Sequence, residues 1–325
     1  MSTAPAIMVT AAGAIIGQGI LRSLRMAKGD YRLVGLDRNA NAYGASLCDA
    51  CYRKPCAETD TAYLPWLGDV IEREHIQLIL PGIEEDVFFF HDHREAMKGW
   101  PVQVALNSPP TIEAGRDKWL LHETMQRQHL PIIPTTVPAD WRTLCSTLGE
   151  PPFIAKAKRG SGSRGQRILR HETDWQQQRH LCTGDFVVQK LVGTDEEEYT
   201  VGLFGYGDGK SSHLFMLRRR LWGGGTWQAE VIDVDDTLAE FCGALTHIFQ
   251  PLGPTNYQFR RDGVKWYLLE INPRISAATA IRAGFGFNDA MLCVNYYLRG
   301  QSHPQPAALR RGQCQRYITE HFDFA

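Results

Sequence analysis

The first 81 residues alternate between strand and helix patterns, and this alternation constrains the fold more than any other feature of the sequence. The apolar residues 7–10 (IMVT) are followed by a glycine-rich turn and an amphipathic stretch, and residues 31–37 (YRLVGLD) repeat the strand pattern. A helical stretch at residues 64–75 leads into a third apolar run at residues 77–81 (QLILP). Alternating units of this length are typical of a parallel, doubly wound sheet. We therefore predict an N-terminal, Rossmann-like α/β domain.

The glycines of the first turn do not have the spacing of a dinucleotide-binding motif. Ala11 stands where the first glycine of G-x-G-x-x-G would be, and the glycines that follow are at positions 13, 17 and 19. Asp37 ends the second strand, where an acid can bind a ribose, so an NAD-dependent oxidoreductase is one alternative. A Rossmann-like domain without a bound nucleotide fits the spacing better.

Acidic residues follow the third strand, at the edge of the sheet where ligands commonly bind in open α/β folds. Glu84 and Glu85 are therefore candidate substrate contacts. The alternative is that they cap the next helix, because a helix N-terminus favours negative charge.

The composition is that of a soluble, globular protein. Of the 325 residues, 43% are hydrophobic and 22% are charged, and the formal net charge is −1, so no global field attracts nucleic acid or a membrane surface. The sequence has no apolar run long enough to span a membrane and no basic segment before an apolar core at its start. We expect a cytoplasmic protein that binds neither nucleic acid nor membrane.

Eight cysteines are scattered along the chain, and three of them lie close together in the sequence. Cys48 and Cys51 form a C-x-x-C motif, with Cys56 nearby. Zinc binding and redox chemistry are the functions typical of such a motif, but no second C-x-x-C and no H-x-x-x-H completes a metal site. Reduced thiols in a cytoplasmic enzyme fit this pattern better.

The sequence NSPP at residues 107–110 interrupts the alternation and predicts a domain boundary. Residues 111–130 then read as one helix, and residues 153–158 read as a strand that carries Lys156. The strand leads into RGSGSRG, residues 159–165. This segment can fold over a polyphosphate, because the backbone N–H groups of glycines can approach the phosphates closely and Lys156 supplies positive charge. It is not a Walker A loop, since no G-K-[ST] ends it, and an ordinary mobile surface hairpin is the alternative.

Residues 253–277 read as two strands joined at Arg-Asp-Gly. Successive side chains of a strand point to opposite faces, so Glu270 and Asn272 share a face. A three-residue loop with its glycine in the left-handed conformation would pair Gln258 with Trp266 and bring Gln258 to that same face. The aromatic and aliphatic side chains would then pack inward, namely Tyr257, Phe259, Tyr267, Leu269 and Ile271.

The oxygen-bearing side chains of this hairpin suit Mg²⁺, which is usually held by one or two carboxylates plus substrate phosphates. Arg274 follows Asn272 by two residues and could face the same point. The alternative for Gln258, Glu270 and Asn272 is an ordinary solvated face.

In this order, the motifs resemble those of the ATP-grasp superfamily, closest to its carbamoyl-phosphate-synthase-like carboxylate–amine ligases. The resemblance extends from about residue 7 to residue 298. It implies an α/β, Rossmann-like pre-ATP-grasp domain at residues 1–110 and an α+β ATP-grasp domain at residues 111–325. The second would divide into a small flap subdomain at about residues 125–188 and a C-terminal subdomain at residues 189–325.

The resemblance also implies roles for single residues. The residues expected to contact ATP are Lys118, Lys156, the flap residues Gly160, Ser161, Gly162 and Ser163, the hinge residues Gln189, Lys190, Leu191 and Val192, and Glu198 at the ribose. The expected magnesium ligands are Gln258, Glu270 and Asn272. The expected catalytic residues are Lys156 and Arg274. The expected substrate contacts are Glu84, Glu85, Arg218, Arg220, Arg274 and Ser276.

Two positions depart from the family pattern. Ala157 stands where a proline usually follows the flap lysine, which should only loosen the strand. Lys190 stands where an acid often lies in the hinge, so we expect the adenine to be recognised through backbone groups.

The activity that the resemblance implies is an ADP-forming ligation with ATP and two Mg²⁺ ions. A small-molecule carboxylate would be activated as an acyl phosphate and attacked by an amine, and a homodimer is compatible with this activity. Besides the oxidoreductase, the alternatives are a nucleotide-binding protein without turnover and a kinase-like or carbamoyl-transfer chemistry.

Overall fold

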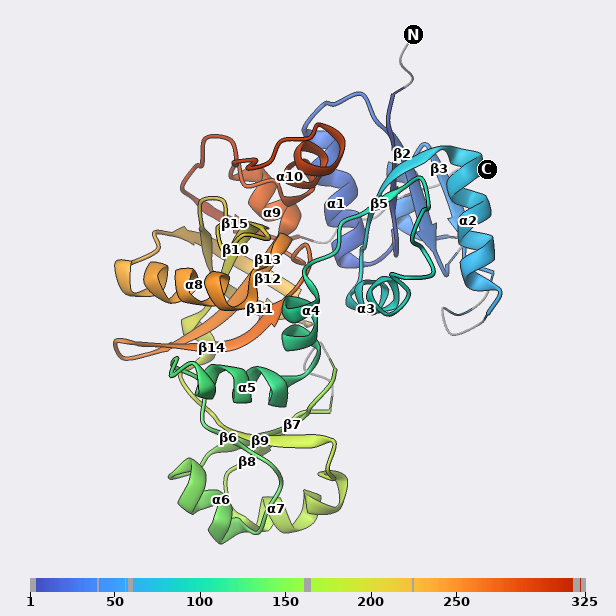
Figure 1. Ribbon diagram of the computed structural model, residues 1–325. Helices are drawn as coiled ribbons and strands as arrows, with labels where there is room; N and C mark the ends of the chain where they lie inside the picture. Colours follow the sequence, from blue (N-terminus) through green and yellow to red (C-terminus); the bar gives the residue numbers. More distant parts are fainter. Residues whose placement is uncertain are drawn as a thin grey trace.

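The computed structural model describes residues 4–39, 41–55, 57, 61–160, 165–223, 225–317 and 322. Three β-sheets organise these residues, with helices packed on them (Figure 1). A parallel sheet lies beside a six-stranded antiparallel sheet, and a four-stranded sheet lies at the far end of the molecule, beyond α5. The predicted fold class, an α/β part followed by an α+β part, is confirmed.

The N-terminal sheet has five parallel strands in the order β3-β2-β1-β4-β5. Its elements are β1 Ala6–Val9, α1 Ile15–Met26, β2 Arg32–Asp37, the 3₁₀ helix η1 Tyr43–Leu47, β3 Ala50–Arg53, α2 Tyr63–Glu74, β4 Ile76–Leu80, α3 Glu84–Asp92 and β5 Gln103–Val104. Ile7 and Val9 belong to the core beneath α1, whereas Met8 belongs to the core beneath α2 and α3. Burial on both faces is typical of a parallel sheet that helices cover, and the doubly wound prediction is confirmed.

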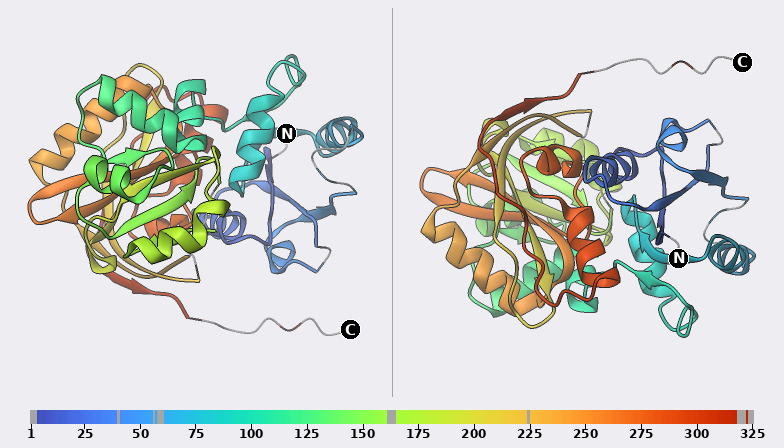
Figure 2. Two further views of the ribbon diagram at one scale, coloured as in Figure 1. Left: turned by 90° about the horizontal axis from the view of Figure 1, so that it is seen from below. Right: turned by 90° about the horizontal axis from the view of Figure 1, so that it is seen from above.

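The N-terminal domain shares a core with the C-terminal part of the chain. Ile7 and Leu24 belong to the same apolar cluster as Phe204, Ile275 and Phe287. Helix α1 lies between the parallel sheet and the helices α9 and α10, which Figure 2 shows from above. This shared core therefore holds the parallel sheet next to the six-stranded sheet.

The four-stranded sheet is antiparallel, in the order β6-β9-β7-β8. The elements of this region and of the connection to it are α4 Pro109–Arg116, α5 Lys118–Arg127, β6 Thr135–Thr136, α6 Trp141–Leu148, β7 Phe153–Ala157, β8 Arg167–Leu169, α7 Glu172–Gln178, η2 Arg179–Leu181 and β9 Phe186–Lys190. The single helix predicted for residues 111–130 is wrong. The chain divides at Asp117, whose side chain accepts hydrogen bonds from the backbone N–H groups of Trp119 and Leu120 and so caps α5.

The six-stranded sheet is antiparallel, in the order β14-β13-β10-β11-β12-β15. Its elements are η3 Asp195–Glu197, β10 Glu198–Tyr206, β11 Phe215–Trp222, β12 Gly225–Ile232, α8 Asp236–Phe249, β13 Leu252–Asp262, β14 Lys265–Asn272, α9 Thr279–Gly284, α10 Asp289–Cys293, the π-helical turn η4 Val294–Leu298 and β15 Gln313–Gln315. In β10, Tyr199, Val201 and Leu203 pack in the core with α8. Glu198 and Thr200 alternate with them and therefore face the other side.

The β13–β14 hairpin closes with a shorter turn than predicted. Asp262 is the last paired residue of β13, the loop has two residues, and Gly263 adopts the left-handed region at φ 58°. The three-residue loop that would pair Gln258 with Trp266 is therefore wrong. Tyr267, which was predicted to pack inward, is only partly buried, and its neighbour Trp266 is in the core instead.

A β-bulge then changes the register of the hairpin. Leu269 is the extra residue of β14, and beyond it Gln258 pairs with Glu270. The bulge also interrupts the alternation, because Leu268 and Ile271 both enter the core although they are three positions apart. Leu269, predicted to pack inward, lines a cleft. The bulge, and not a three-residue loop, therefore brings Gln258 next to Glu270.

Candidate active site

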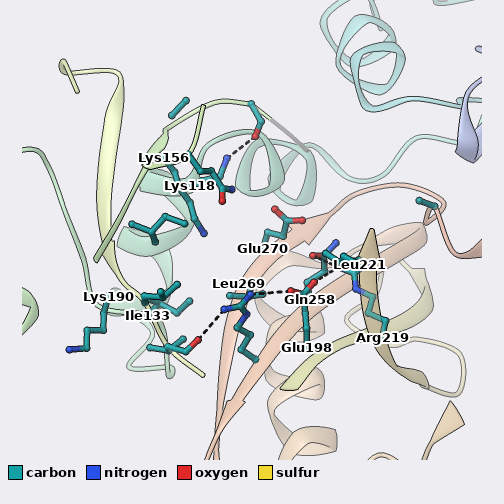
Figure 3. Close-up of a pocket in the computed structure, with 18 of the residues that line it drawn as sticks. Lys118, Ile133, Lys156, Lys190, Glu198, Arg219, Leu221, Gln258, Leu269 and Glu270 are labelled. Carbon is teal, nitrogen blue, oxygen red and sulfur yellow. Dashed lines mark hydrogen bonds and ion pairs between the residues drawn. The ribbon is translucent and has the colours of Figure 1, made fainter. Parts of the chain in front are cut away.

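A cleft lies between the four-stranded sheet and the six-stranded sheet, and side chains from both sheets line it (Figure 3). Lys156 on β7 and Lys118 at the start of α5 form one wall. Glu270 on β14 and Gln258 on β13 lie across from them, with Glu198 of β10 behind. Residues that are far apart in the sequence therefore meet in one cavity.

Positive charge predominates in this cleft. The basic side chains that bring positive charge to it are Lys118, Lys156, Arg219, Arg260 and Arg274, whereas the acidic ones are Glu198 and Glu270. A cleft with an excess of cations concentrates anions, because low-dielectric walls focus the field. The lining therefore suits a polyanion such as a triphosphate.

Lys156 is held in a partly desolvated position. Burial lowers its pKa to about 8, the Glu270 carboxylate acts in the opposite direction, and the charge of Lys118 adds to the lowering. Desolvation disfavours an ammonium ion, and a nearby anion restores it. An anionic ligand in the cleft would thus stabilise the protonated form of Lys156.

Lys118 connects α5 to the loop between β7 and β8. It is the first residue of α5, after the capping Asp117. Its Nζ donates to the carbonyl of Gly160 at 2.7 Å, and its backbone N–H donates to the carbonyl of Lys158 at 3.0 Å. Asp117 also forms an ion pair with Arg159 at 3.2 Å. The remaining residues predicted for the flap tip, Ser161, Gly162 and Ser163, lie outside the described residues.

Two of the three predicted magnesium ligands, Glu270 and Asn272, are joined by a hydrogen bond that Arg274 extends. Asn272 Nδ2 donates to Glu270 Oε1 at 3.1 Å, and Arg274 Nη2 donates to Asn272 Oδ1 at 2.7 Å. Asn272 is buried and, unlike Gln258 and Glu270, is not among the residues that line the cleft. The N-terminal domain reaches the same group, because Glu84 Oε1 lies 3.8 Å from Arg274 Nη2.

Arg219 is a buried residue of the cleft that the sequence did not reveal. Its Nη2 donates to Glu198 Oε1 at 2.8 Å and to Gln258 Oε1 at 2.7 Å. Arg260 approaches the other oxygen of Glu198 at 3.3 Å. One guanidinium therefore joins the predicted ribose-binding acid to the predicted metal ligand, and it orients both.

The two neighbours of Arg219 point away from this cleft. Arg218 and Arg220 alternate with it on β11 and are exposed, and Arg218 forms an ion pair with Glu230 at 2.6 Å. The structure does not bring these two predicted substrate contacts to the cleft. A signal was present in the three consecutive arginines, because a strand must turn the middle one to the opposite face.

The predicted hinge divides into two parts. Gln189 is buried and donates to Thr135 Oγ1 at 3.0 Å, and Lys190 bonds to the carbonyl of Glu150 at the rim, with its amino group directed away from the cleft (Figure 3). The apolar part of the lining includes Ile133, Ile154, Leu191, Val192 and Leu269. This apolar surface suits a flat heterocyclic base, with recognition left to backbone groups.

The remaining predicted substrate contacts differ in their accessibility. Ser276 is buried and lines the cleft, and Glu84 is buried at the start of α3, beside Arg274. Glu85 is exposed and does not line the cleft. The carboxyl ends of the parallel strands therefore contribute one acid to the site.

The polar side chains of two other candidate binding positions already have hydrogen-bond partners within the protein. Asp37 accepts from the backbone N–H of Gly13 at 2.7 Å and of Asn39 at 2.8 Å, so its carboxylate organises the loops at the sheet edge. Within the described part of the chain, His91, Asp92 and Glu113 are close enough to share an ion. However, both nitrogens of His91 make hydrogen bonds, and Arg116 binds both oxygens of Asp92. This cluster is an ion-pair network.

No helix among the described residues is long and apolar enough to cross a membrane. Residues 185–321 match the family model described as "ATP-grasp in the biosynthetic pathway with Ter operon". A search of curated proteins finds no significant match.

Solved structures similar to this chain include N5-carboxyaminoimidazole synthetase from Staphylococcus aureus in complex with ADP. It has a TM-score of 0.76 at 18% identity, over 98% of this chain and 83% of that chain. Biotin carboxylase from Campylobacter jejuni, a β,γ-ATP complex, has a TM-score of 0.70 at 19% identity, over 95% of this chain and 74% of that one. N5-carboxyaminoimidazole ribonucleotide synthetase from Thermus thermophilus has a TM-score of 0.70 at 16% identity, over 94% and 81%. At such identities the likeness establishes the fold, and the resemblance stated from the sequence is confirmed at that level.

Proposed function

We propose that this protein, whose chain has the ATP-grasp fold, is an ADP-forming ligase that uses Mg·ATP to join a small-molecule carboxylate to an amine. The observation that carries the proposal is the cleft itself. Lys118 and Lys156 face Glu270 and Gln258 across one cavity, with Arg274 beside them. Residues 1–110 would be the pre-ATP-grasp domain, and residues 111–325 the ATP-grasp domain, with the flap subdomain at about 125–188 and the C-terminal subdomain at 189–325.

The nucleotide would lie between the two sheets. Lys118 and Lys156 would contact the phosphates, and Glu198 would accept from the ribose hydroxyls while Arg219 and Arg260 hold its carboxylate in place. The apolar surface near the hinge would hold the base. ADP is present in the similar S. aureus structure, and we transfer that ligand to this chain as part of the proposal.

The donor set at the hairpin fits Mg²⁺. Glu270 offers a carboxylate, and Gln258 and Asn272 offer amide oxygens, which are hard ligands of the kind this ion takes. Each amide oxygen already accepts one N–H from an arginine and has a second lone pair for a cation. Bound Mg²⁺ would neutralise charge on the phosphates and orient them. The arginines would fix the direction of the two amides, as outer partners of metal ligands do.

The reaction would consist of two displacements. A carboxylate oxygen of the acid attacks the γ-phosphorus of ATP, the bond to the β–γ bridging oxygen breaks, and ADP leaves. The amine nitrogen then attacks the acyl carbon, the carbon–oxygen bond to phosphate breaks, and the amine loses a proton. Lys156 and Arg274 would offset the charge that develops on the transferred group. The protein otherwise supplies positioning, and closure of the residues 159–165 loop would exclude water from the acyl phosphate.

The test is an ADP-release screen over small carboxylates paired with amines, at saturating Mg·ATP. We expect Glu270→Gln and Lys156→Met each to reduce ADP formation at least about a hundredfold, as loss of one electrostatic contact to a transition state does. Glu230→Gln is the matched control, because Glu230 lies on β12 and pairs with Arg218 outside the cleft. Unchanged ADP formation in either cleft variant would remove the proposal.

Oxygen-18 in the carboxylate of the productive acid distinguishes this mechanism from others within the fold. The label must appear in the released phosphate if the acid attacks phosphorus. A kinase-like reaction would instead leave phosphate on the product. A nucleotide-binding protein without turnover would be stabilised by Mg·ATP in a thermal-shift assay, yet would release ADP with none of the acid–amine pairs.

A further inference from the structure

The C-x-x-C motif of the N-terminal domain lies outside the cleft, and the fold brings its two sulfurs together. Cys48 follows η1, and Cys51 is the second residue of β3. The chain bends at residues 48 and 49, so both side chains turn toward Gly35 of the neighbouring strand β2. A methyl carbon placed on Gly35 would lie 2.7 Å from Cys48 Sγ and 3.1 Å from Cys51 Sγ. The absence of a side chain at Gly35 therefore leaves the space in which the two sulfurs meet.

The two thiols differ in exposure and in acidity. Cys48 is half-buried and Cys51 is exposed. Cys48 Sγ donates to the carbonyl of Gly44 at 3.3 Å. The neighbouring Cys48 side chain lowers the pKa of the Cys51 thiol, whereas the proximity of Cys51 and burial both raise the pKa of the Cys48 thiol. A thiol whose thiolate is stabilised and accessible is the one that attacks, and its protonated neighbour is placed to resolve the product.

We propose that Cys48 and Cys51 are a redox-active dithiol that closes reversibly to a disulfide by exchange with a low-molecular-weight disulfide such as oxidised glutathione. The Cys51 thiolate attacks one sulfur of the glutathione disulfide, its S–S bond breaks, and one glutathione thiolate leaves. Cys48 then loses its proton and attacks Cys51 Sγ, which releases the second glutathione. Two protein thiols are oxidised, and one glutathione disulfide is reduced to two thiols.

Formation of the Cys48–Cys51 disulfide would affect a cavity beside the parallel sheet. Tyr43, in η1, lines a cavity there together with Asp37, and η1 is tied to α1 because Arg25 donates to the carbonyl of Leu47 at 3.1 Å. Arg25 also forms an ion pair with Asp49, between the two cysteines, at 2.9 Å. A covalent bond from Cys48 to β3 would therefore restrain the wall of this cavity.

The test uses the full-length protein in buffers with increasing ratios of oxidised to reduced glutathione. The reaction is quenched with acid, free thiols are alkylated, and peptides are mapped by mass spectrometry. We expect a Cys48–Cys51 disulfide to form and to be reversed by reduced glutathione. In Cys48→Ser, Cys51 should accumulate as a mixed disulfide with glutathione. In Cys51→Ser, modification of Cys48 should be slower by about tenfold or more, because it has lost its attacking partner.

Two control variants and a folding check complete the test. Cys145→Ser, in α6, should leave the disulfide unchanged, and so should Cys56→Ser, which tests pairing with the third cysteine of the cluster. Circular dichroism and thermal melting verify that each variant is folded. The proposal is overturned if Cys48 and Cys51 stay alkylated as free thiols at every ratio. It is also overturned if either of them pairs with a different cysteine.

Discussion

Replacement of Lys156 by methionine should stabilise the folded protein while it removes ATP binding. The pKa of Lys156 falls from 10.5 to about 8 on folding, chiefly because of burial. One pKa unit corresponds to about 1.4 kcal/mol, so the folded state carries a penalty of up to about 3 kcal/mol below pH 8. Methionine has a similar length and no charge, so it should remove most of this penalty.

The sign of the pH dependence follows from the same shift. Between pH 8 and pH 10.5 the unfolded chain binds more protons at this site than the folded protein does, so wild-type stability rises with pH in this window. The advantage of Lys156→Met should therefore be about 3 kcal/mol near pH 7 and should shrink to about half near pH 9.5.

Urea unfolding of wild type and Lys156→Met at the two pH values measures this difference, provided that their urea slopes agree. Lys98→Met is the matched control, because the side chain of Lys98 is 77% exposed and its removal should change stability little at either pH. Mg·ATP should raise the melting temperature of wild type and of Lys98→Met, but not that of Lys156→Met. A methionine variant less stable than wild type near pH 7, or an advantage that does not shrink with pH, would refute the reasoning.

The remaining predictions concern buried charges and the nucleotide. Arg219→Met removes the closest cation from buried Glu198, so we expect the free energy of unfolding in urea to fall by about 3 kcal/mol and Mg·ATP to give no stabilisation. Arg218→Met is the control and should change neither quantity. An Arg219 variant with unchanged stability and unchanged response to Mg·ATP would contradict the role assigned to Arg219. Arg282→Met leaves fully buried Asp289 without its cation and should lower the free energy of unfolding by about 3–5 kcal/mol. In a double-mutant cycle, adding Asp289→Asn should recover part of that loss, whereas additive losses would argue against coupling between the two residues. NAD(H) should not shift the melting temperature of the wild type, whereas Mg·ATP should raise it; the reverse result would favour the oxidoreductase.

The sequence predicted the parts of the fold that depend on local pattern. The strands β1, β2 and β4 are apolar runs between amphipathic helices, and such runs lead to a parallel sheet whatever the distant residues are. The break at Asp117 was missed because helix-forming residues continue on both sides of it. An aspartate that caps a helix resembles one on a helix surface unless its hydrogen bonds are known.

The parts of the site that were missed depend on strand pairing. Arg219 meets Glu198 only because β10 and β11 are neighbours with Tyr199 opposite Arg218, and sequence alternation alone cannot give that register. The bulge at Leu269 is of the same kind, because its position is decided by how both strands of the hairpin pair.

The contact between Glu84 and Arg274 joins the Rossmann-like N-terminal part of this molecule to the cleft. Glu84 stands at the carboxyl ends of the parallel strands, where such sheets commonly bind ligands. Its carboxylate lies 3.8 Å from the arginine that follows the Glu270–Asn272 pair, and the shared core of Ile7 and Phe204 holds the two parts in this position. In the proposed ligase, a ligand at the carboxyl ends of the parallel strands would therefore be presented to the end of the cleft that we assign to the phosphates, which would place an acid next to ATP.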